Sequence, residues 1–162
     1  MDAHSFWKLL HLLGASVLFG TGMGIAFFAW FGYRRAMASG EIDGLRTVLR
    51  LTVIGDTVFT APAVVVQLVS GLVLVHMNQW SLTSPWSLTV LGLYVLVGAC
   101  WLPVVVIQVL MSREAAAART MSELTATFHR RFLIWFVLGV PAFLIVVVIF
   151  YLMIAKPLAV IG

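Results

Sequence analysis

Four long apolar runs follow one another along the chain, at approximately residues 9–33, 51–76, 87–111 and 132–155. A helix needs about 20 residues to cross a hydrocarbon core about 30 Å thick, and every run is at least that long. The pattern therefore predicts an all-α, polytopic membrane protein built as a bundle of four transmembrane helices. The longest connection, around residues 111–131, is rich in alanine and looks like a helical extension, so we expect a single domain over residues 1–162.

The first run carries an ionisable side chain inside the predicted membrane region. His11 lies about one helical turn into the run, where no water solvates its ring. At about 100° per residue, His11 shares one side of the helix with Ala15, Leu18, Gly22 and Ala29. Small side chains beside an imidazole allow another helix or a flat macrocycle to approach closely. His11 is therefore a candidate cofactor ligand, with Ala15 and Gly22 as candidate contacts of the cofactor.

A polar stripe follows one face of the second run. Its members fall within about 40° of one another at the helical period, and they are Asp56, Thr60, Ala63, Gln67, Ser70 and Leu74. We expect Gln67, and Gln108 in the third run, to form hydrogen bonds between helices.

Asp56 is the only acidic residue inside the four runs, where an unpaired carboxylate is costly. As a functional group it would carry a proton or orient a substrate. The structural interpretation, which we favour because Asp56 lies near a helix end, is an ion pair with Arg50, Arg130 or Arg131, supported by a hydrogen bond from Gln108. Either interpretation places Asp56, Gln108 and Arg131 in the polar interior of the bundle.

The third run has a stripe of its own, because Tyr94, Trp101 and Gln108 recur every seven residues and share a face. Such a stripe usually packs in the core and sometimes forms the wall of a cofactor site, for which Trp101 is the candidate. Three prolines inside the runs remove backbone donors and are expected to kink their helices: Pro62, Pro103 and Pro141.

Composition and charge set the class and the orientation of the protein. Hydrophobic residues make up 62% of the chain and charged residues 10%, a balance that no soluble domain of this size would show. Eight of the ten Lys and Arg residues flank the first and third connections, whereas residues 77–86 carry no charge. The positive-inside rule places these two connections in the cytoplasm and both termini outside, in a bacterial inner membrane. The arginines also explain the basic pI, and we expect no nucleic-acid partner.

This orientation gathers three histidines near the outer face, namely His4, His11 and His76. Imidazole ligates haem iron, copper and zinc, and bundles build such sites from facing helices. A haem b held between the first two helices by His11 and His76 fits in depth, although the helical period turns His76 about 160° away from the polar stripe. Met77 and Met153 are alternative metal ligands.

Two further features of the sequence are a pair of glycines and a single cysteine. Gly20 and Gly24 form a GxxxG pair opposite the His11 face, which would suit a homodimer interface. Cys100 is the only cysteine and has no intrachain disulfide partner, so we interpret it as a small core residue.

Ordered motifs run along the chain: residues 8–15 with 19–22, Asp56 with 61–63 and 67–71, 100–103 with Gln108, Arg131 with Trp135 and 139–142, and residues 152–157. They resemble those of the bacterial integral-membrane family called domain of unknown function 2269. The resemblance covers essentially the whole chain. It implies an integral membrane protein and brings no settled activity with it.

More distantly, the Lys-x-x-His pattern that ends at His11 is similar to that of J-type protoporphyrinogen IX oxidases and copper-resistance D membrane proteins. Those families imply a haem b protein and a copper-handling domain, respectively. Only His11 maps onto their patterns, and the third run has no lysine. We therefore expect a haem b or related metal centre near the outer face, which serves electron transfer with a redox partner. Copper binding or permeation is one alternative, and an accessory subunit without a cofactor is another.

Overall fold

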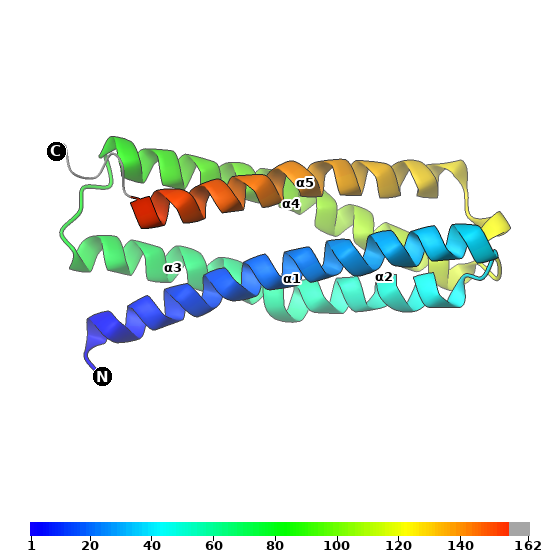
Figure 1. The fold of residues 1–162 in the computed structure, drawn as a ribbon, viewed down its shortest axis with the longest axis horizontal. Helices are drawn as coiled ribbons and strands as arrows, with labels where there is room; N and C mark the ends of the chain where they lie inside the picture. The colour runs from blue at the N-terminus through cyan, green and yellow to red at the C-terminus, as the bar shows by residue number, and fades with distance from the viewer. Residues whose placement is uncertain (156–162) are drawn as a thin grey trace.

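The structure is a computed structural model that describes residues 1–155, and every regular element in this part of the chain is helical (Figure 1). The elements are α1 (Ala3–Ser39), α2 (Asp43–Gly55), the π-helical turn η1 (Asp56–Thr60), α3 (Ala61–Met77), α4 (Pro85–Ala117), the 3-10 turn η2 (Met121–Glu123) and α5 (Ala126–Ala155). Four stretches are long and apolar enough to cross a membrane: α1, the continuous segment Asp43–Met77, α4 and α5. The predicted all-α class and its four spans are confirmed.

Polar side chains cap the N-termini of α1 and α4. Asp2 Oδ1 accepts a hydrogen bond from the backbone nitrogen of Ser5 at 2.7 Å, and Ser84 Oγ accepts one from that of Ser87 at 3.2 Å. At the other end of α1, Gly40 adopts φ 76°, the left-handed conformation that glycine tolerates best. The helical extension expected after the third run is present as far as Ala117.

A π-helical turn interrupts the second span just before Pro62. The backbone N–H of Ala61 bonds to the carbonyl of Asp56, five residues earlier. Pro62 has no N–H to donate and its ring crowds the carbonyl four residues back, so a wider turn relieves the conflict. The irregularity predicted at Pro62 therefore exists as a π turn. Pro103 and Pro141 lie inside α4 and α5, which continue through them, and kinks there stay predictions.

The helices form two pairs that converge at one end of the molecule. In Figure 1, α1 runs beside α2 and α3, while α4 passes behind α5 and reaches α2 at the right. We call this the packed end, which contains the connections 40–42 and 118–125. Most of the buried core lies there, including Leu45, Leu49, Met111, Phe128 and Phe132. At the opposite end, which we call the open end, the ribbons of α3 and α4 are apart (Figure 1).

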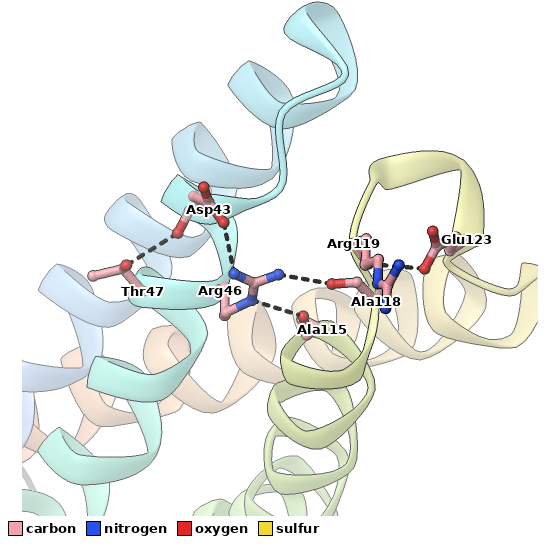
Figure 2. Close-up of polar contacts among 7 residues, drawn as sticks. All are labelled: Asp43, Arg46, Thr47, Ala115, Ala118, Arg119 and Glu123. Carbon is pink, nitrogen blue, oxygen red and sulfur yellow. Dashed lines mark hydrogen bonds and ion pairs between the residues drawn. The ribbon is translucent and has the colours of Figure 1, made fainter.

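One arginine joins the two pairs at the packed end (Figure 2). Arg46 on α2 donates from Nε to the carbonyl of Ala115 at 3.1 Å and from Nη2 to that of Ala118 at 2.7 Å. The first carbonyl lies in the last turn of α4, at the negative end of its dipole, and the second belongs to the residue that caps the helix. Asp43 holds the same guanidinium through Nη1 at 2.6 Å. The side chain of Arg46 thus completes the end of α4.

We expect Arg46→Met to lower the free energy of unfolding by about 1–2 kcal/mol, because two charge-assisted hydrogen bonds are lost from a partly exposed site. Thermal unfolding of the detergent-solubilised protein, followed by circular dichroism, measures this change. Arg50→Met is the matched control, since Arg50 lies one turn later on α2, is exposed and forms no ion pair within residues 1–155. Equal effects of the two substitutions would contradict the proposed role of Arg46.

Candidate functional site

The contact between α1 and α3 depends on two glycines that face polar side chains. A Cβ added at Gly71 would lie 3.1 Å from Cε1 of His11, and one added at Gly14 would lie 2.8 Å from Oε1 of Gln67. Each helix therefore offers a glycine where the other carries a large polar side chain. The absence of a Cβ lets the two backbones approach closely enough for His11 and Gln67 to meet.

Both ring nitrogens of His11 have partners on α3. Nδ1 lies 2.9 Å from Ser70 Oγ, and Nε2 lies 3.0 Å from Gln67 Nε2. Ser70 Oγ donates its own proton to the carbonyl of Val66 at 2.6 Å, so it accepts from Nδ1–H, and Nε2 accepts from the Gln67 amide. This assignment, made from the hydrogen-bond network, gives a neutral imidazole. We call His11, Gln67 and Ser70 the His11 network.

The His11 network occupies both ring nitrogens of a predicted haem or metal ligand, but it does not test whether His11 binds a metal. For His11 to bind iron or copper through Nε2, the ring would have to exchange its contact with Gln67 for the metal. His76 is exposed in the last turn of α3, while His4 and Met153 are half-buried near the same end. Within residues 1–155, no three His, Cys, Asp or Glu side chains are grouped closely enough to hold a metal ion. Ligation by His11, His4, His76 and Met153 therefore stays a prediction.

Gly14→Ala should lower the free energy of unfolding by about 1–2 kcal/mol, because the new methyl group displaces Gln67 and breaks its bond to His11. The matched control is Gly24→Ala on the same helix, where an added Cβ meets nothing within 4 Å. Thermal unfolding of the two variants is measured in the same detergent. The comparison distinguishes the effect of displacing Gln67 from the general effect of replacing a helical glycine by alanine. A Gly14→Ala protein as stable as the control would show that Gln67 and His11 contribute little to the contact.

A cavity of about 510 Å³ lies between α1, the second span, α4 and α5. Three residues predicted to flank a cofactor line it, namely Ala15, Gly22 and Trp101. Most of its wall is aromatic or aliphatic, and the aromatic part consists of Phe19, Phe27, Trp30, Phe31, Tyr94, Trp101, Trp135, Phe136, Phe143 and Phe150. Trp30 and Trp135 were not among the site residues expected from the sequence. Nothing in their spacing distinguishes them from the tryptophans outside the cavity.

Asp56 is the one charged residue among those that line the cavity, and its side chain belongs to a buried chain of hydrogen bonds. Gln108 Nε2 donates to Asp56 Oδ2 at 2.5 Å, and Trp135 Nε1 donates to Gln108 Oε1 at 3.3 Å. Asp56 is 7% exposed and Gln108 1%. The amide of Gln108 is thereby oriented with its donor toward the carboxylate.

The hydrogen bond from Gln108 was predicted, but the ion pair favoured for Asp56 was wrong. Arg131 pairs instead with Glu114 on α4, with Nη1 to Oε2 at 3.1 Å, and both lie toward the packed end. Arg50 and Arg130 are exposed, and neither forms an ion pair within the described part of the chain. A guanidinium that reaches Glu114 and water has less to gain from a buried carboxylate. Within residues 1–155, Asp56 therefore accepts a hydrogen bond from an amide and has no cation beside it.

Three buried polar atoms have no hydrogen-bond partner within residues 1–155: Thr60 Oγ1, Gln67 Oε1 and Trp101 Nε1. All three belong to residues that line the same cavity. Buried polar atoms are rarely left unpaired, because desolvation without a hydrogen bond costs about 1–3 kcal/mol each. Tyr94, by contrast, satisfies its hydroxyl by donating to the carbonyl of Val64 at 2.7 Å, which links α4 to α3.

A family of known sequences covers nearly all of this chain. The sequence model of the family described as predicted integral membrane protein (DUF2269) matches residues 5–157. No curated protein and no solved structure matches the chain. The more distant likeness to J-type protoporphyrinogen IX oxidases and copper-resistance D proteins stays an expectation.

Proposed function

Since the chain belongs to the DUF2269 family of predicted integral membrane proteins, we propose that it is a membrane-embedded binding protein for an amphipathic small molecule. The observation that carries this proposal is the cavity, whose aromatic and aliphatic wall includes the carboxylate of Asp56 and the hydroxyl of Thr60, which has no partner within residues 1–155. A molecule with an apolar body and a polar head would cover the wall and pair with these groups.

The dimensions and chemistry of the cavity support binding. Small-molecule sites commonly enclose about 300–1,000 Å³, are mostly apolar, and use a few polar groups to orient the ligand. Here the polar groups lie mainly on the second span and α4, where Asp56, Thr60 and Gln108 are buried. The head group would lie there, and the apolar body would extend toward α1 and α5.

The location that we propose is the bacterial inner membrane, with both termini outside. It rests on the arginines, which flank the two connections at the packed end. The packed end would then face the cytoplasm. A reporter domain that is active only outside the cell can be inserted after Ser122. Activity of this reporter would overturn the proposed orientation.

Haem b bound for electron transfer is a second candidate, because Ala15, Gly22 and Trp101 line a cavity near the His11 network. It requires His11 to release Gln67, and His11 itself is not among the lining residues. Copper would require His4, His76 and Met153, which do not line the cavity either. An absorption spectrum of the reduced protein tests whether it binds haem. If α and β bands are present and His11→Ala abolishes them, haem is favoured over the amphipathic ligand.

Gly98→Leu should abolish ligand binding, because Gly98 lines the cavity and its added side chain would fill space where a Cβ meets nothing within 4 Å. The probe is bromophenyl-butanol, whose bromine quenches tryptophan fluorescence on contact, and the protein is held in phosphatidylcholine nanodiscs. Wild-type protein should show saturable quenching, and Gly98→Leu only the linear quenching that comes from partition into lipid.

Gly92→Leu is the matched control for this experiment. Gly92 lies on the same helix, does not line the cavity, and likewise has nothing within 4 Å of an added Cβ. Saturable quenching should persist in this variant. A wild-type protein that binds neither this alcohol nor the corresponding amine would refute the proposed function.

A further inference from the structure

The charge balance of the cavity indicates what kind of head group it accepts. Asp56 accepts one hydrogen bond, at Oδ2 from Gln108, and its Oδ1 has no hydrogen bond within residues 1–155. Among residues 1–155, no other charged side chain lines the cavity. A carboxylate removed from water is costly unless a positive charge or a proton compensates it. Within residues 1–155 no side chain supplies a cation there, and a positively charged ligand would supply one.

The hydroxyl of Thr60 lies on the same face as Asp56. Both residues belong to the π turn and line the cavity, Thr60 is 6% exposed, and its Oγ1 has no hydrogen-bond partner among residues 1–155. A hydroxyl oxygen accepts hydrogen bonds, and a protonated amine has several N–H donors. One ammonium group can therefore pair with the carboxylate and the hydroxyl together.

The indole rings add a second attraction for positive charge. Trp30, Trp101 and Trp135 all line the cavity, and Trp135 is connected to Asp56 through Gln108. The face of an indole attracts a cation, most strongly where water is excluded. These rings also offer a large apolar surface to the rest of the ligand.

From this placement we infer that the cavity binds a lipophilic amine in its protonated form, with the ammonium between Asp56 and Thr60 and the apolar body against the aromatic wall. The inference rests on the proposed function and specifies its ligand class. It follows from a buried carboxylate that no cation from residues 1–155 accompanies, a neighbouring unpaired acceptor, and the indoles that line the same cavity.

Two probes with the same skeleton test this inference, bromophenyl-butylamine and bromophenyl-butanol, which differ in the ammonium and the hydroxyl. Saturable tryptophan quenching is measured in phosphatidylcholine nanodiscs, with each probe corrected for partition into protein-free discs. We expect wild-type protein to bind the amine at least about tenfold more tightly than the alcohol, as a charge-assisted contact would give.

Asp56→Asn should remove this preference, because the side chain loses its charge while the asparagine oxygen still accepts the bond from Gln108. Thr60→Val should weaken amine binding by about threefold to tenfold through the loss of one acceptor. Glu41→Gln is the charge-matched control, since it removes an exposed carboxylate outside the cavity and should keep the preference.

The outcomes separate this inference from the proposed function. Wild-type protein that binds both probes equally, or an Asp56→Asn protein that still prefers the amine, would overturn the amine while leaving cavity binding intact. Absence of saturable quenching by either probe would overturn both. Loss of the preference in Glu41→Gln as well would attribute it to the net charge of the protein and also overturn the inference.

Discussion

Inside a bilayer a polar group has no water to bond with, so every polar side chain within the four spans has to find its partner in the bundle. The arrangement of the helices follows from this constraint. His11 brings α1 against α3 through Gln67 and Ser70, and the two glycines opposite these side chains make the approach possible. Tyr94 joins α4 to α3 by the same principle, through a main-chain carbonyl.

The same constraint explains why the two ends of the molecule differ. At the packed end, Arg46 bonds the last carbonyls of α4 and Arg131 pairs with Glu114, while aromatic and aliphatic side chains fill the space between the helices. Farther along, large aromatic side chains of α1, α4 and α5 surround a cavity that they do not fill. Of the residues that line it, Thr60, Gln67 and Trp101 each carry a buried polar atom without a partner within residues 1–155.

Hydrophobic periodicity was sufficient to predict the four spans and the inward face of the second one, because burial in a bundle follows the helical period. Asp56, Thr60, Ala63 and Ser70 of the stripe are buried, Gln67 is half-buried, and the bond from Gln108 was expected too. The partners of His11 were missed. Its contact with Gln67 depends on glycines at two particular positions of two different helices, and spacing along one helix carries no information about how two helices align.

For Asp56, one prediction from the sequence was confirmed and another was wrong. The high cost of a buried carboxylate correctly implied that Asp56 needs support, but not that an arginine would provide it. The π turn that accommodates Pro62 begins at Asp56 and ends at Thr60, so the backbone irregularity places both residues at the cavity. Arg131 lies farther toward the packed end, where Glu114 satisfies it. The carboxylate thus lies at the cavity with an amide beside it and no cation from residues 1–155, which is the physical ground for the proposed cationic ligand.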